Sequence, residues 1–147
     1  MELNILRADP AGNITVFVLD PVEKAQRAAI AEKIMAIPAL KAEQVGYACA
    51  AEDDVDGHME MMGGEFCGNA TRAYGMYIAQ QKGGLSSVRL RVSGCDHAVT
   101  AQVDLKSGTA RAEMPCPRSV KRVTVNGHEG TLVDLTGCLL YTSPSPR

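Results

Sequence analysis

The sequence predicts an α+β fold in which mostly antiparallel strands are wrapped around one central helix. Short apolar or alternating runs bounded by turn residues recur along the chain, and two segments show the three- and four-residue spacing of a helix. Strands therefore outnumber helices, which is not the pattern of a βαβ parallel sheet. With 147 residues, 46% of them hydrophobic, the chain can form one packed domain and the start of another.

The N-terminal part is expected to contain a hairpin, a helix and two further strands. Asp9-Pro10-Ala11-Gly12 is a strong turn signal between the first two apolar runs. Pro21 marks a helix start, because its fixed backbone angle suits the first turn. The helix over 22–36 is expected to place charged side chains such as Arg27 on its outer face. The expected strands are 3–7, 15–19, 45–51 and 58–62.

The central helix is predicted over residues 68–81. Its apolar side chains recur at helical spacing: Ala70, Tyr74, Tyr77 and Ile78. Gly83-Gly84 ends the pattern. Cys67 stands at the beginning of this helix, directly before Gly68-Asn69 and shortly after two more glycines. The helix is thus expected to begin at a single cysteine.

The remaining part is expected to consist of strands with one domain boundary. The expected strands are 88–92, 97–105, 109–114, 120–125 and 131–135, the last two forming a hairpin around Asn126-Gly127. Pro115-Cys116-Pro117 interrupts the pattern, so 1–117 is expected to be an N-terminal domain and 118–137 the start of a second. Residues 138–147 resemble one reading frame of a sequencing-library transposase adapter, which predicts a non-native tail. An ordinary disordered terminus is the alternative.

Composition and charge argue against several classes of function. A net charge of −2 gives no basic footprint for nucleic acid, and no apolar run reaches membrane-spanning length. No secretory signal peptide is recognisable, and the cysteines lack CxxC or zinc-ligand spacing. We therefore expect reduced thiols in a cytoplasmic protein without a metal site. The acidic run at 53–57 lacks the spaced ligands and closing glutamate of a calcium loop, and is expected to be a solvated turn.

Cys67 is the candidate catalytic residue. Unpaired backbone N–H groups and the positive end of the helix dipole favour an anion at a helix N-terminus. A thiolate could use that position, and so could a substrate carboxylate bound by the N–H groups of Gly68 and Asn69. The alternative is a packing role, because free cysteine is among the most buried residue types. The neighbouring glycines favour function, since they let the backbone approach a ligand.

Two segments carry a resemblance to a known family. The run Cys67-Gly68-Asn69-Ala70-Thr71-Arg72 resembles the first active-site motif of the diaminopimelate epimerase superfamily, which contains cysteine-dependent, pyridoxal-independent amino-acid racemases. The segment from Ala11-Gly12-Asn13 to Asp20 resembles the family's Gly-Asn-Asp-Phe segment, which implies that Asn13 contacts the substrate. The resemblance covers most of residues 2–137. It implies two similar halves, each with one cysteine, of which this chain is the first.

The chain departs from the diaminopimelate enzymes near the motif. Met59-Glu60-Met61-Met62-Gly63-Gly64 stands in place of Asn-Ala-Asp-Gly-Ser, and Gly46-Tyr47-Ala48-Cys49 in place of Gly-Phe-Asp-Gln. Groups that bind a distal amino-acid end are therefore missing, which favours another substrate. The Gly-Gly-Glu-Phe-Cys-Gly-Asn form is more similar to superfamily racemases that supply D-histidine for metallophore synthesis. Diaminopimelate epimerase and a non-catalytic small-molecule binding domain remain the alternatives, and the lack of a CxxC pair disfavours a thiol redox protein.

The resemblance implies a cofactor-free racemisation of an amino acid. Two cysteines on opposite faces of the substrate can remove the Cα proton and return one, the first as thiolate base and the second as thiol acid. Backbone donors on the carboxylate would stabilise the developing charge. Because the second cysteine is expected in the absent half, the 147-residue chain alone is expected to be inactive. The expected partner is a small-molecule amino acid, and the full-length protein could form a homodimer.

Overall fold

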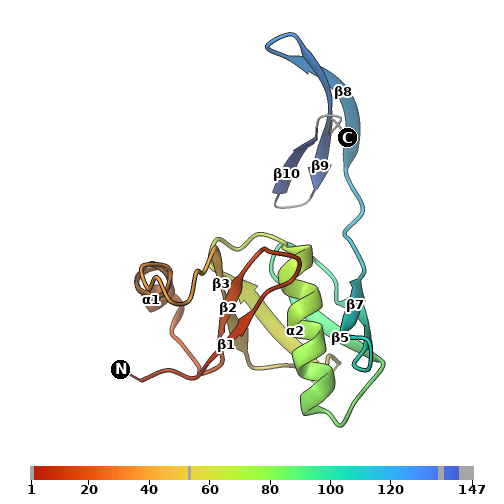
Figure 1. Ribbon diagram of the computed structural model, residues 1–147. Coiled ribbons are helices and arrows are strands. Elements are labelled where there is room, and N and C mark those ends of the chain that lie inside the picture. Colours follow the sequence, from red (N-terminus) through yellow and green to blue (C-terminus); the bar gives the residue numbers. More distant parts are fainter. Residues whose placement is uncertain (1, 53, 136–137, 143–147) are drawn as a thin grey trace.

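The computed structural model describes residues 2–52, 54–135 and 138–142 (Figure 1). The elements in chain order are β1 (Ile5–Ala8), β2 (Thr15–Val18), α1 (Lys24–Met35), β3 (Gln44–Cys49), β4 (Gly57–Met61), α2 (Gly68–Gln81), β5 (Ser87–Val92), β6 (Val99–Asp104), β7 (Thr109–Ala112), β8 (Ser119–Val125), β9 (His128–Leu135) and β10 (Cys138–Thr142). Strands β1 to β7 form one sheet in that order, and β8 to β10 form a second sheet. The α+β class is confirmed.

The seven-stranded sheet is mixed. Four neighbouring pairs are antiparallel, whereas β2 pairs with β3 and β4 pairs with β5 in parallel. A parallel pair needs a long crossover, and α1 and α2 supply the two crossovers. Two βαβ units are therefore built into a mostly antiparallel sheet, which the sequence analysis did not anticipate.

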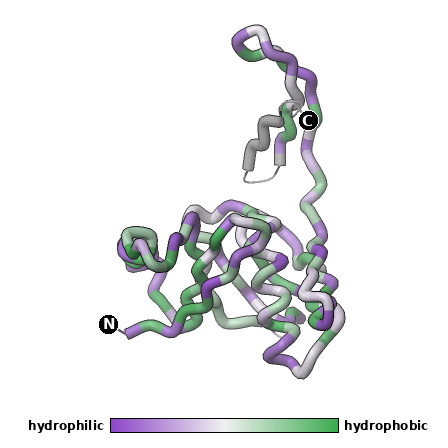
Figure 2. Tube along the Cα trace, viewed as in Figure 1, coloured by the Kyte–Doolittle hydropathy of each residue, from purple (hydrophilic) through white to green (hydrophobic). Residues whose placement is uncertain are grey.

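Each face of this sheet is covered by one helix. Successive strand residues point to opposite faces, so Phe17 of β2 packs in the core under α2, while Val16 and Val18 pack under α1. Both faces of β2 are therefore buried, and Figure 2 shows this strand as an almost continuous hydrophobic stretch. The candidate thiol belongs to the α2 face.

Helix α2 packs closely on the sheet. A Cβ on Gly75 would lie 2.7 Å from the Cβ of Ala101 on β6, so this glycine permits the close approach. Tyr74 is buried, donates to the carbonyl of His58 on β4 at 3.1 Å, and has its pKa raised to about 12 by burial. These contacts fix the helix whose first residue follows Cys67.

The second sheet begins with the expected hairpin. β8 and β9 pair from Val125↔His128 onward, and the connecting residues Asn126 and Gly127 both have positive φ (50° and 80°), as a two-residue hairpin turn requires. β10, within the segment expected to be a non-native tail, pairs with β9. Residues 143–147 of that segment lie outside the described residues. The domain boundaries remain predictions.

The first helix differs from expectation in two details. α1 begins at Lys24 after Glu23, so Pro21 precedes the helix rather than starting it. Arg27 does not project into solvent, because its long side chain turns toward the sheet and pairs with Glu60 of β4. The prediction of an outward Arg27 was wrong.

Candidate active site

Cys67 is the N-cap residue of α2. Its backbone is extended (φ −129°, ψ 109°), and its Sγ accepts the N–H of Ala70 at 3.5 Å. Its carbonyl accepts the Thr71 N–H at 2.9 Å and the Thr71 hydroxyl at 2.8 Å. Thr71 is fully buried, so it anchors the first turn of the helix to the cysteine. The predicted helix range, 68–81, and the N-terminal position of Cys67 are confirmed.

A side-chain amide from β3 also contacts the thiol. Gln44 Nε2 lies 3.2 Å from Cys67 Sγ, 2.8 Å from Asn13 Oδ1 and 2.7 Å from Thr15 Oγ1. An amide nitrogen carries two hydrogens, so these three acceptors share them. Gln44 reaches the site because β3 pairs in parallel with β2 and Gln44 lies directly opposite Thr15.

The two asparagines predicted to bind substrate lie in the same network. Asn69 Nδ2 donates to Asn13 Oδ1 at 3.3 Å, and Arg72 Nη2 donates to Asn69 Oδ1. Asn13 Nδ2 in turn donates to Glu43 Oε2 at 3.1 Å. Asn13 and Cys67 thus share the amide nitrogen of Gln44, and Asn69, which is 56 residues from Asn13 in the sequence, joins the network through Asn13 Oδ1.

Backbone donors complete the site. Gly68 and Asn69 are the first two residues of α2, so their N–H groups have no acceptor within the helix. The sulfur of Met114 lies 3.2 Å from the position that a Cβ on Gly68 would take, which makes Met114 a neighbour of this helix end. The arrangement offers a thiol beside two backbone donors of a helix N-terminus, which suits an anionic ligand.

Sequence reasoning found the cysteine and both asparagines but missed Gln44, Thr15 and Arg72. A signal for Gln44 did exist, because it is a polar residue at the start of the apolar run at 45–48. Its role nevertheless depends on which strand pairs with β3, and this pairing is not local in sequence. Glu65 Oε2, two residues before the cysteine, lies over Gly63, 2.5 Å from the position of a Cβ there.

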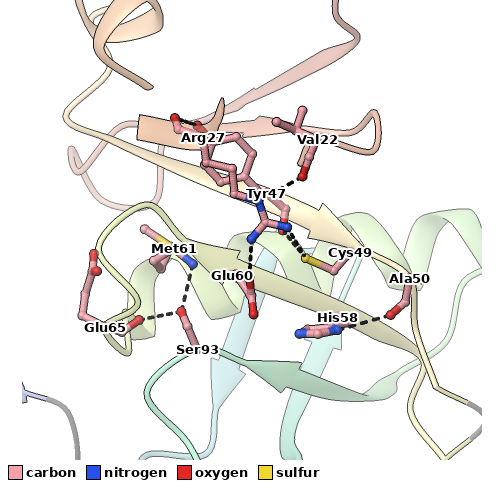
Figure 3. Close-up of polar contacts among 10 residues, drawn as sticks. All are labelled: Val22, Arg27, Tyr47, Cys49, Ala50, His58, Glu60, Met61, Glu65 and Ser93. Carbon is pink, nitrogen blue, oxygen red and sulfur yellow. Dashed lines mark hydrogen bonds and ion pairs between the residues drawn. The ribbon is translucent and has the colours of Figure 1, made fainter. Parts of the chain in front are cut away.

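A second thiol lies on the opposite face of the sheet (Figure 3). Cys49 Sγ accepts from Arg27 Nη2 at 3.4 Å, and the same guanidinium pairs with Glu60 and lies 5.1 Å from the ring centroid of Tyr47. Burial raises the pKa of Cys49, and the nearby Arg27 charge opposes this only in part. Cys49 thus joins Arg27 and Glu60 in a polar cluster between α1 and the sheet.

The remaining cysteine, histidine and acidic side chains of the described residues form no disulfide and no metal-binding cluster. Cys49, Cys67, Cys95 and Cys116 are free thiols. Among the described residues, no group of three or more His, Cys, Asp or Glu side chains could hold a metal ion. None of the helices in the described part of the chain has the length and apolar character needed to cross a membrane.

The fold and this site place a free thiol at the N-terminus of a central helix, beside backbone N–H groups that suit an anion. Residues 2–140 match the family described as the histidine racemase CntK N-terminal domain. The chain belongs to this family.

Characterised relatives agree with this assignment. The chain is 31% identical over 144 residues to a histidine racemase of Fusobacterium nucleatum subsp. nucleatum, covering 92% of this chain and 52% of the relative. It is 32% identical over 122 residues to a histidine racemase of Staphylococcus aureus, covering 80% of this chain and 44% of the relative. The chain thus spans about half the length of these relatives.

Proposed function

We propose that the complete protein is an amino-acid racemase that inverts histidine without a cofactor, and that Cys67 serves one face of the substrate. The observation that carries the proposal is the position of Cys67 Sγ at the N-cap of α2, within 3.2 Å of Gln44 and beside the N–H groups of Gly68 and Asn69. The family and the names of both relatives support it.

The proposed chemistry is a proton transfer at Cα. As a thiolate, Cys67 Sγ takes the Cα proton, and the electron pair left on carbon is delocalised into the carboxylate. A proton from an acid on the opposite face then completes the inversion, so that no electrons are gained or lost. We place that acid, a second cysteine, in the half of the protein beyond this chain. Free thiols are maintained in the cytoplasm, where we expect the enzyme to work.

The N-terminus of α2 binds the carboxylate in this proposal. The N–H groups of Gly68 and Asn69 are oriented before the substrate arrives, so they can stabilise the growing negative charge without rearrangement. Asn13 Oδ1 accepts from both Gln44 and Asn69, so Asn13 links the amide that contacts the thiol to the first turn of α2. Gln44 fixes the thiol, because it donates to Sγ while bound to buried Thr15.

Histidine is the proposed substrate because both relatives carry that name. The segment before the motif agrees with a substrate other than diaminopimelate. Met62, Gly63 and Gly64 offer no polar side chain for a second charged amino-acid end, so nothing on this segment favours the diaminopimelate alternative.

Deuterium exchange tests the proposal. The complete protein should exchange the Cα hydrogen of histidine with D₂O, as followed by proton NMR, and should racemise it. Cys67→Ser should lower the exchange rate by about 10⁴-fold or more, because a serine hydroxyl is a very poor base at neutral pH. Binding of histidine should survive, since the backbone N–H groups are unchanged.

Diaminopimelate is the matched substrate control. Faster exchange of diaminopimelate than of histidine would replace the substrate assignment and keep the reaction. Full exchange by Cys67→Ser would contradict the proposed role of the thiol, and binding without any exchange by the wild type would favour a binding domain.

A further inference from the structure

Ser93 lies in the turn between β5 and β6, and its hydroxyl joins two parts of the backbone that precede Cys67 (Figure 3). Its Oγ accepts the N–H of Met61, the last residue of β4, at 2.8 Å. The same hydroxyl donates to the carbonyl of Glu65 at 2.7 Å. One half-buried side chain thus satisfies a donor and an acceptor on either side of the Met62–Gly64 turn.

The turn between these two contacts is narrow. Gly64 N–H donates to the Met61 carbonyl at 3.0 Å, and Gly64 has a positive φ of 75°. Met61 and Glu65 are the two ends of this turn, so the Ser93 hydroxyl closes it at its base. Opening the turn would break both hydrogen bonds of Ser93.

Gly94, the residue after Ser93, packs against the same segment of backbone. Gly94 has a φ of 74°, and a Cβ there would lie 2.3 Å from the backbone nitrogen of Phe66. No side chain fits in that space, so the loop after β5 packs directly on the backbone at 65–66. Phe66 is itself 7% exposed and belongs to the core under α2. Ser93 and Gly94 therefore both contact the backbone at 65–66, one or two residues before Cys67.

We propose that Ser93 is a positioning residue for Cys67. This inference rests on the proposed function. Two residues of chain separate the Glu65 carbonyl from Cys67, a path of at most about 7 Å, and buried Phe66 prevents this path from absorbing a shift. Loss of the Ser93 hydroxyl moves the base of the turn and, with it, the thiol. Ser93 sets the position of the Cys67 sulfur and does not touch the reacting atoms.

A positioning role for Ser93 predicts a change in kcat and in labelling of Cys67 that a general loss of folding would not produce. A displaced base lowers the rate of proton transfer much more than it weakens binding of a carboxylate held by Gly68 and Asn69. In the complete protein, Ser93→Ala should lower kcat for Cα exchange about tenfold to a hundredfold, with little change in KM. It should also change the rate of iodoacetamide labelling at Cys67, and the pH dependence of that rate, but not the labelling of Cys49.

Three further variants control the experiment. Ser93→Thr keeps the hydroxyl and should restore kcat and the labelling profile to near the wild-type values. Ser93→Cys keeps the approximate shape of the side chain but has a much weaker donor, so its kcat should be lowered as much as that of Ser93→Ala. If Ser93→Ala does not fold, Ser93→Cys tests the claim in its place. Ser87→Ala removes an exposed hydroxyl from the start of β5, the strand that precedes Ser93, and should behave as the wild type.

The outcomes separate this inference from the proposed function. Wild-type kcat and labelling in Ser93→Ala, or in Ser93→Cys, would overturn the positioning role, as would an equal loss in Ser93→Thr. If the wild type exchanges no amino acid, the proposed function fails, and the labelling of Cys67 in the same variants still decides whether Ser93 places the thiol.

Discussion

Two half-buried thiols, Cys67 at the N-terminus of α2 and Cys49 on β3, have opposite environments. Cys67 is held by neutral amide donors at the N-terminus of α2, whereas Cys49 is held by the guanidinium of Arg27. A neighbouring cation often marks a reactive cysteine, because it favours the thiolate. Arg27 is already paired with Glu60, however, and burial raises the pKa of Cys49. A charged neighbour alone therefore does not define a catalytic thiol.

Strand alternation separates the two environments. Gln44 and Cys49 are five residues apart on β3, so their side chains point to opposite faces of the sheet. Gln44 faces α2 and reaches Cys67, while Cys49 faces α1 and joins Arg27 and Glu60. One strand thus contributes a contact to the candidate thiol on one face and a polar cluster on the other.

The largest expected effect is on catalysis by the two cysteine variants. Cys67→Ala should abolish the proposed racemisation of histidine, a loss of about 10⁴-fold or more, because it removes one of the two proposed bases. Cys49→Ala should stay close to the wild-type rate. Polarimetry of the complete proteins measures both. Equal losses in the two variants would mean that the comparison between the thiols is wrong.

Substitutions of the two residues that contact the thiols should have different effects: loss of Gln44 should lower activity, and loss of Arg27 should lower stability. Gln44→Leu should lower kcat by about a hundredfold by freeing the thiol. Arg27→Met should leave the rate of the folded enzyme nearly unchanged but lower the free energy of unfolding by about 2 kcal/mol, because Glu60 loses its partner in a partly buried site. Urea unfolding measures the second effect. Lys24→Met, an exposed change on the same helix, is its control, and an equal loss of stability there would remove the role given to Arg27.

The smallest effect is expected at Asp56, which lies away from both thiols. The N–H of Arg89 and then Lys82 hold the pKa of Asp56 below its usual value. A carboxyl with a lowered pKa in the folded state stabilises the protein above its unfolded pKa and loses this contribution as the pH falls through the folded pKa. Asp56→Asn should therefore cost less than about 1 kcal/mol at neutral pH, and the difference from wild type should shrink as the pH falls through the lowered pKa of Asp56.

Urea unfolding at several pH values checks this, with Asp54→Asn on the same loop as the control. Labelling of Cys67 should be unaffected in both variants. A difference from wild type that persists unchanged in acid would show that the carboxylate charge of Asp56 is not the cause.

The part of the site that is local in sequence could be predicted. Helix α2 and its cap at Cys67 follow from glycine placement and apolar spacing within a short window, and both are found at the expected residues. Gln44 could not be predicted, because its contact requires the parallel pairing of β3 with β2. Arg27 was placed outside because helical periodicity treats charge as surface, whereas a long side chain can reach Glu60 across the helix–sheet interface. Contacts between elements, rather than the elements themselves, were the missing information.

Substrate protection of the thiols tests the central claim most directly. The complete protein is treated with iodoacetamide with and without histidine, and labelling of each cysteine is followed by peptide mass spectrometry. Our account predicts that Cys67 is labelled faster than Cys49, and that histidine slows labelling at Cys67 alone. Labelling of Cys67 that is slow and insensitive to histidine, together with protection of Cys49, would contradict the claim that Cys67 faces the substrate.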